Sequence, residues 1–88
     1  MTYTVIWKQR ALDQLAEIWL ASIDRERISS AANQIDRWLR NDPESKGESR
    51  PANRRLVIVS PLAFVIEVSN ADRIVEILSV AAFKRKRL

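Results

Sequence analysis

In two segments of the first half of the chain, apolar residues recur every three or four positions, as they do in an amphipathic helix. In the first segment the apolar residues fall three or four positions apart on one helix face, which holds Leu12, Leu15, Ala16, Trp19 and Ile23. In the second segment the same spacing links Ile28, Ala31, Ala32, Ile35, Trp38 and Leu39. The pattern predicts helices over residues 9–22 and 25–41, each with one face directed at a core.

Signals at the ends of the second segment agree with these limits. Asp24 is a good N-cap, because its carboxylate can accept hydrogen bonds from the free backbone N–H groups of the first turn. Asn41-Asp42-Pro43 ends the helix, since the residue before a proline is pushed out of the α region. The link between the two helices is short, so we expect an antiparallel helical hairpin.

The rest of the chain has the β-branched and aromatic composition of strands. Four segments have this composition: residues 2–7, 56–59, 62–68 and 73–83. Ser60-Pro61 and Ser69–Asp72 separate the last three as hairpin turns, and residues 44–53 are expected to form an exposed loop. We therefore predict a single α+β domain over residues 1–88, in the order β-α-α-β-β-β, with an antiparallel sheet packed on an antiparallel helical hairpin.

Apolar residues remain on both faces of the predicted sheet. Strict alternation along the last two strands places one apolar group opposite the helix-facing one, and this second group contains Val65, Val75, Ile77 and Phe83. Two helices can cover only one face of a sheet, so we expect the second group to bind a partner. Two alternatives are open: residues 44–53 cover the group, or the strand register is shifted by one residue.

Charge is distributed unevenly between the two halves. Residues 1–44 carry six Lys and Arg against seven Asp and Glu, whereas residues 45–88 carry nine against four. The chain ends in Phe83-Lys84-Arg85-Lys86-Arg87-Leu88, and its net charge is +4. The basic half is expected to attract a polyanion or an acidic protein partner.

Several classes of function are excluded by composition. With no Cys and no His, the chain has neither a thiolate zinc site nor Ser-His-Asp or papain-like chemistry. We expect no metal and no cofactor. No apolar run approaches the roughly 20 residues that span a bilayer, and the N-terminus lacks a signal pattern. We therefore expect a cytoplasmic protein with no membrane partner.

Three patterns taken together resemble the RelE/ParE toxins of bacterial type II toxin–antitoxin modules. The first is Val5-Ile6-Trp7 followed by Ala11, Leu15 and Ile18, and the second is Ala32, Ile35-Asp36, Leu39 and Pro43. The third joins Arg55-Leu56, Val59 and Pro61 to Asp72-Arg73-Ile74-Val75, Ile77-Leu78 and Val80. The resemblance covers nearly the whole chain and rests on this distributed pattern rather than on one sharp motif.

The resemblance implies a growth-inhibiting toxin of a plasmid stabilisation system, held inactive by a cognate antitoxin that covers its apolar surface. Operator DNA would be a partner only through the antitoxin. Members of one branch poison DNA gyrase, and members of the other cleave messenger RNA on the ribosome. We favour the gyrase-binding, ParE-like branch; ribosome-dependent RNA cleavage and a non-toxic, basic nucleic-acid-binding relative are the alternatives.

The sequence departs from the RNA-cleaving branch at informative positions. Many relatives have Pro-Tyr-Arg and a further Tyr where this chain has Pro61-Leu62-Ala63 and Ile66, and many have His at the position of Ala82. Arg55 and Arg85 do match basic positions of the family, so they are the catalytic candidates if the protein is a ribonuclease, with a role in stabilising the charge of the phosphate transition state.

The other basic residues of the second half are candidates for contact with nucleic acid or another target. The set comprises Arg50, Arg54, Arg55, Lys84, Arg85, Lys86 and Arg87. A solvated tail and edge-protecting charges are the structural alternatives. Glu67 and Glu76 lie on adjacent predicted strands, where they can face each other or pair with Arg73 or Arg55, and a structural ion pair is favoured over a role as catalytic acid.

Overall fold

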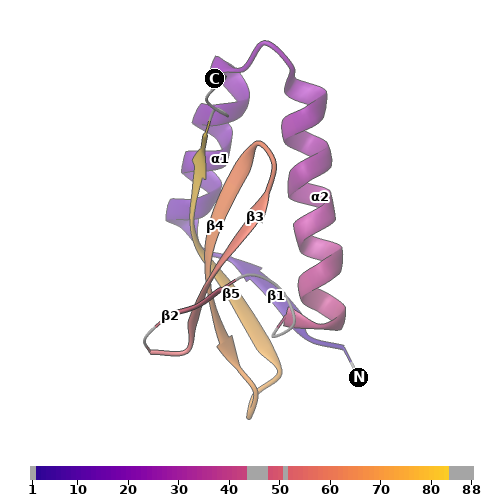
Figure 1. The fold of residues 1–88 in the computed structure, drawn as a ribbon, viewed down its shortest axis with the longest axis vertical. Helices are drawn as coiled ribbons and strands as arrows, with labels where there is room; N and C mark the ends of the chain where they lie inside the picture. Colours follow the sequence, from indigo (N-terminus) through magenta and orange to yellow (C-terminus); the bar gives the residue numbers. More distant parts are fainter. Residues whose placement is uncertain (1, 44–47, 51, 84–88) are drawn as a thin grey trace.

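The computed structural model describes residues 2–43, 48–50 and 52–83, of which 48–50 are described by their backbone only. The elements, in chain order, are β1 (Thr4–Trp7), α1 (Gln9–Ala21), α2 (Arg25–Asn41), β2 (Glu48–Arg50), β3 (Arg54–Val59), β4 (Leu62–Ser69) and β5 (Ile74–Ala82). Figure 1 shows the two helices side by side, with the strands beside them. The predicted α+β class and both helices are confirmed.

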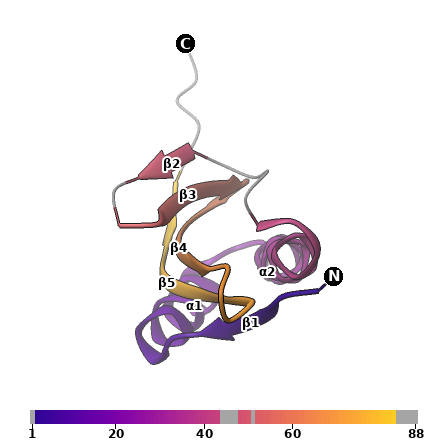
Figure 2. The ribbon, with the colours of Figure 1, turned by 90° about the horizontal axis from the view of Figure 1, so that it is seen from below.

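The strands form one curved sheet in the order β1-β5-β4-β3-β2. Strands β2 to β5 pair antiparallel, but β1 runs parallel to β5, which corrects the expectation of a wholly antiparallel sheet. Parallel neighbours need a crossover connection, and the path from β1 to β5, which includes the helical hairpin, supplies it. Figure 2 shows α2 in the concavity of this sheet.

Strand β2 is a second correction, because residues 48–50 were expected to lie in a loop. They pair with β3 at Glu48↔Leu56 and Arg50↔Arg54. The chain reverses through Ala52 and Asn53, whose φ angles are 62° and 61°. Residues in this left-handed conformation are common in tight β-hairpin turns. The sequence Pro-Ala-Asn, however, lacks the glycine that usually indicates such a turn. The hairpin was therefore not visible in the sequence.

Helix α2 contributes most of the helical side of the core. Asp24 is its N-cap and accepts a hydrogen bond from the backbone N–H of Arg27 at 3.2 Å. Its buried residues are Ile28, Ala31, Ile35 and Leu39, as the spacing predicted. In α1 only Ala11 is buried, and the face predicted for the core is largely half-buried or exposed.

A β-bulge in β5 decides which face of the sheet each residue occupies. Val65 is opposite Ser79 and the next residue, Ile66, is opposite Ile77, so Leu78 is left as an extra residue. The bulge reverses the alternation halfway along the strand. Val75 and Ile77 are therefore fully buried on the helix side, and their expected place on the partner-binding face was wrong.

Two of the three tryptophans contribute to packing. The Trp7 ring meets Phe64 edge-on, with 6.0 Å between ring centroids, and Trp38 packs half-buried against the core. Trp19 is 39% exposed, although the sequence favoured a core position for it. The apolar stripe of α1 is thus wider than the surface that the sheet covers.

Candidate functional site

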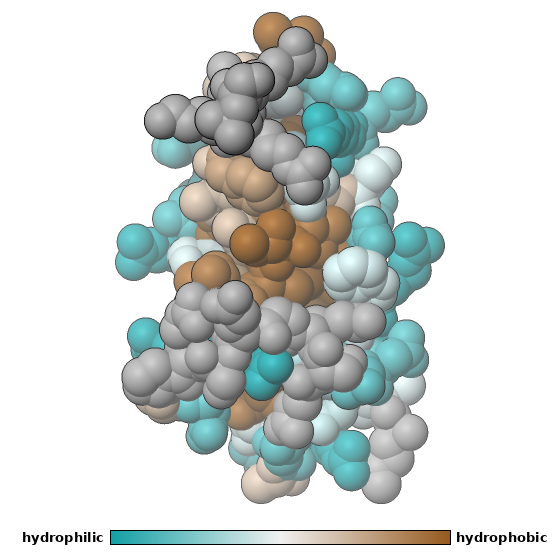
Figure 3. All heavy atoms as spheres, viewed as in Figure 1, coloured by the Kyte–Doolittle hydropathy of each residue, from teal (hydrophilic) through white to brown (hydrophobic). Residues whose placement is uncertain are grey.

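The outer face of the sheet, which lies opposite the helix-facing core, carries three rows of side chains. They are set by the strand register, because residues directly opposite each other on neighbouring strands point to the same face. The first two rows are apolar or small and run across β3, β4 and β5: Ile58–Ala63–Ala81 and Leu56–Val65–Ser79. Figure 3 shows apolar side chains gathered in the middle of the face seen in Figure 1, over the β3–β4 hairpin.

The apolar rows are open to solvent in the described part of the chain. Ile58 is 56% exposed, and Leu56, Val65 and Ala63 are half-buried. An isolated exposed Ile is ordinary, but neighbouring rows of exposed apolar side chains on one face of a sheet are typical of surfaces that bind a partner. Val65 is the one residue of the predicted partner group that lies in these rows.

The third row is charged and crosses the three central strands of the sheet. Arg54, Glu67 and Glu76 are opposite one another on β3, β4 and β5. Arg54 Nε lies 3.6 Å from Glu67 Oε1, and Lys8 Nζ lies 2.9 Å from Glu76 Oε2. Two carboxylates thus face each other in the middle of the row with a cation on either flank. This agrees with the structural reading of Glu67 and Glu76.

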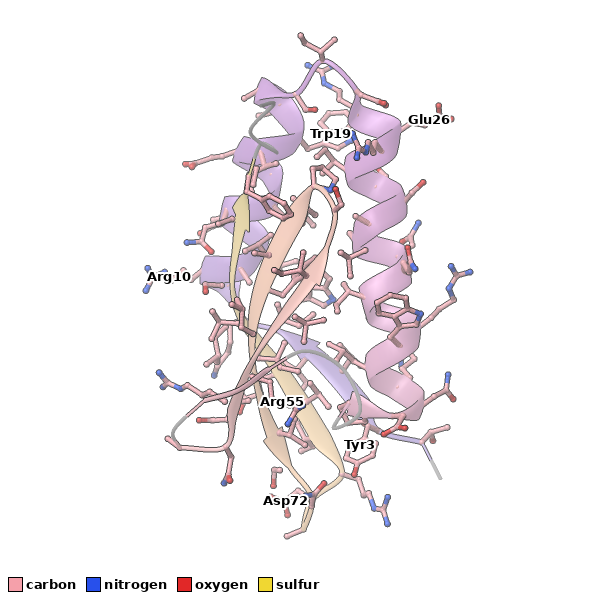
Figure 4. The ribbon with its side chains drawn as sticks, in the orientation of Figure 1. Tyr3, Arg10, Trp19, Glu26, Arg55 and Asp72 are labelled. Atoms are coloured by element: carbon pink, nitrogen blue, oxygen red, sulfur yellow. The ribbon has the colours of Figure 1, made fainter. Side chains whose placement is uncertain are left out.

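Arg54 and Arg55 lie on opposite faces of the sheet. Arg55 is opposite Ile66, whose side chain is buried on the helix side, and Arg54 is opposite the outward Glu67. Figure 4 labels Arg55 at the lower part of β3. The structure therefore does not bring these two contact candidates together in one basic patch.

The remaining basic candidates lie outside the side chains that the structure describes. They are Arg50 and the C-terminal residues Lys84, Arg85, Lys86 and Arg87. The proposed catalytic pair of Arg55 and Arg85 thus has one described member, Arg55, on the helix side of the sheet.

Phe83 belongs to a different surface from Val65. It is 37% exposed and its backbone N–H donates to the Pro61 carbonyl oxygen at 3.0 Å. With Ile18, Ile23 and Arg27 it lines a hollow of about 430 Å³ between the end of β5 and the α1–α2 turn. The predicted partner group is therefore divided among the outer face, this hollow and the core.

Sequence reasoning missed Ile58 and Leu56 as surface residues. The alternation along residues 54–59 contained the signal, because Val57 and Val59 are buried and the alternate residues Leu56 and Ile58 point outward. Reading Leu56-Val57-Ile58-Val59 as one apolar run concealed it.

Metal-ligating side chains do not cluster in the part of the chain that the structure describes. Among the described residues no group of three or more acidic side chains could hold a metal ion. No described helix is long and apolar enough to cross a membrane. The outer face provides apolar area beside a charge-balanced row, an arrangement suited to binding a partner.

Comparison with known proteins finds similarity in structure only. No family model matches the sequence, and no curated relative matches it. The toxin–antitoxin complex RelBE2 from Mycobacterium tuberculosis has a chain that superposes with a TM-score of 0.75, at 20% identity, over 94% of this chain and 100% of that one.

Two further solved structures give the same result. A chain of the chromosomal ParDE system of P. aeruginosa matches with a TM-score of 0.70 and 16% identity, covering 94% of this chain and 98% of that one. The isolated E. coli RelE toxin matches with a TM-score of 0.65 and 20% identity, covering 96% of this chain and 87% of that one. The chain therefore has the fold of the RelE/ParE toxin–antitoxin structures.

Proposed function

We propose that this protein is the toxin of a type II toxin–antitoxin module and that a cognate antitoxin holds it inactive. The observation that carries the proposal is the uncovered apolar surface of the outer face, combined with the RelE/ParE fold. RelBE2 and ParDE are toxin–antitoxin systems, which supports an antitoxin as the partner of this chain.

The antitoxin surface in this proposal is the pair of apolar rows around Ile58 and Val65. An extended segment or a helix with apolar residues on one side would bury both rows at once. The charged row beside them would then form part of the polar rim, where ion pairs fix orientation more than they add affinity.

We favour binding of a large target such as DNA gyrase as the mode of toxicity. Cleavage of RNA needs a cation free to meet the phosphate and a group that moves a proton. Among the described side chains Arg54 is engaged by Glu67, and Arg55 lies on the helix side of the sheet. These placements favour binding over catalysis.

Ribosome-dependent cleavage of messenger RNA is the second candidate. The basic run Lys84-Arg85-Lys86-Arg87 favours it, because a cluster of cations attracts RNA phosphates. Primer extension on translated transcripts would detect new 5′ ends if the chain cleaves message. Double-strand breaks that depend on gyrase would appear instead if the target is gyrase.

Expression from a tightly repressed promoter tests the proposal directly. We expect growth to stop on induction and to resume when the short reading frame adjacent to the gene is expressed with it. A chain carrying Val75→Asp, which places a charge in the core, is the control for toxicity of an unfolded product. Unchanged growth on induction of soluble, folded wild-type chain would contradict the toxin assignment.

A further inference from the structure

The centre of the charged row on the outer face is acidic. Glu67 and Glu76 are directly opposite each other on β4 and β5, and their side chains are 38% and 30% exposed. Lys8 pairs with Glu76 at one end of the row, and Arg54 lies beside Glu67 at the other. The order of charges along the row is therefore cation, carboxylate, carboxylate, cation.

Neither cation bridges the two carboxylates. Lys8 contacts only Glu76 Oε2, and Arg54 contacts only Glu67 Oε1. Among the residues that the structure describes, the second oxygen of each carboxylate makes no hydrogen bond and no ion pair. Opposite residues on neighbouring strands have Cβ atoms about 4.5–5.5 Å apart, so the two charges repel each other. A cation between them would relieve the repulsion and use both remaining oxygens.

The acidic centre borders the two apolar rows. Val65 precedes Glu67 by two residues and points to the same face, so the two positions are about 7 Å apart along β4. A partner that buries the apolar rows therefore brings its next side chain over Glu67 and Glu76 and excludes water from them. Carboxylates that lose water without gaining a cation weaken binding, so a well-matched partner supplies the cation itself.

We propose that the antitoxin segment covering the outer face carries an arginine whose guanidinium lies between Glu67 and Glu76. This inference rests on the proposed function, because it names the chemistry of the partner that occupies the same face. Arginine fits better than lysine, since its planar fork has five donors and can serve both carboxylates at once. Its aliphatic stem would pack beside Val65.

The spacing of the rows predicts where this arginine stands in the partner sequence. It lies about 7 Å from an apolar anchor over the Val65 row and about 14 Å from an anchor over the Ile58 row. An extended segment along β4 would have it roughly two and four residues from these anchors, and a helix roughly four and eight residues from them. The net charge of +4 by itself favours an acidic partner, so a basic residue at this spacing is a specific expectation of the row.

Neutralisation of the two carboxylates is the first test. The probe is the purified product of the short reading frame adjacent to the gene, titrated calorimetrically into the full chain. Glu67→Gln combined with Glu76→Gln should weaken binding by about tenfold or more, because the arginine is then buried without a counter-charge. Glu17→Gln combined with Glu26→Gln removes the same charge from exposed positions of the helical hairpin and should leave the affinity within about twofold.

Double-mutant cycles identify the partner residue. Each arginine and lysine of the partner is replaced by Ala, and each variant is titrated into the wild-type chain and into the Glu67→Gln, Glu76→Gln chain. One arginine should lose about tenfold in affinity for the wild-type chain and nothing further for the neutralised chain. Lysine at that position should recover only part of the loss. If no arginine of the partner is coupled to the two carboxylates, the proposal is overturned.

Thermal unfolding controls for damage to the fold. The Tm of the neutralised chain should stay within about 4 °C of wild type, since exposed ion pairs contribute little to stability. Glu67→Gln alone keeps the pair between Lys8 and Glu76, so it is the milder second variant and should show part of the same loss of affinity.

Two results would contradict the proposal in different ways. If the product of the adjacent reading frame binds the chain and rescues growth, but binds the neutralised chain as tightly as wild type, the row is only a structural array of ion pairs. The toxin assignment would then stand without the arginine. If the folded wild-type chain neither arrests growth nor binds that product, the proposed function fails and the arginine site fails with it.

Discussion

The guanidinium of Arg25 caps the C-terminal end of α1 and also stacks on the ring of Trp19. Its Nε donates to the Trp19 carbonyl oxygen at 3.1 Å and its Nη2 donates to the Leu20 carbonyl oxygen at 3.1 Å. Its Cζ lies 4.6 Å from the centroid of the indole. A residue at the start of α2 thus donates to two of the last carbonyls of α1 and ties the two helices together at their turn.

The first prediction concerns this contact and the stability of the fold. Arg25→Ala should lower the free energy of unfolding by about 1–2 kcal/mol. The substitution removes the two hydrogen bonds that the charged guanidinium donates to backbone carbonyls and its exposed cation–π contact with Trp19. For a domain of this size that corresponds to a fall in Tm of roughly 4–16 °C, measured by thermal unfolding. Arg37→Ala removes the same charge from an exposed position on α2 and serves as the control. Equal effects of the two substitutions would show that only net charge matters.

The second prediction tests the face that the bulge assigns. Ile77→Ala should cost about 2–5 kcal/mol in urea unfolding, because it opens a cavity beside other fully buried side chains. Ile58→Ala, on the opposite face, should cost less than about 0.5 kcal/mol. If the two changes had similar costs, Ile77 would not be the core residue that the structure describes.

Helix positions in this chain follow from local sequence, whereas the sheet does not. The spacing from Ile28 to Leu39 and the capping carboxylate of Asp24 act within a few residues, so both helices could be predicted with close limits. The extra residue Leu78 is defined only against its partner strand, and nothing in the sequence of β5 alone marks it. Because this one bulge was not predicted, both Val75 and Ile77 were assigned to the surface although they lie in the core.

The candidate site was accessible to sequence reasoning only in outline. That two helices would leave a sheet face uncovered follows from architecture, and Val65 was placed on that face correctly. Arg54 and Arg55 are consecutive on one strand, so alternation alone predicts that they lie on opposite faces. Which of the two points outward depends on strand pairing, and Arg54 is the outward one. The apolar groove between α1 and α2, which Trp19 lines, was missed because a continuous apolar stripe along a helix does not reveal how much of the stripe the sheet will cover.

The third prediction concerns the two facing carboxylates in the charged row. Lys8→Ala removes the cation nearest Glu76 and leaves that side chain opposite Glu67, so it should destabilise the fold by up to about 1 kcal/mol. Adding Glu76→Gln to the same chain should restore most of the loss, because only one carboxylate then remains in the middle of the row. The effect should shrink in high salt, which screens exposed charges. A loss that is independent of salt would point to packing by the Lys8 stem instead.

The fourth prediction separates antitoxin binding from toxicity on the outer face. Ile58→Glu places a charge in the centre of the apolar rows without touching the core, so the chain should fold and arrest growth as before. Its affinity for the antitoxin should fall by about 100-fold or more, since a carboxylate would be buried against apolar side chains. Calorimetric titration of the purified antitoxin measures the affinity, and rescue of growth reports it in cells. Leu20→Glu, a similar change on the helical hairpin, should leave antitoxin binding unchanged. Full rescue of the Ile58→Glu chain would place the antitoxin on another surface.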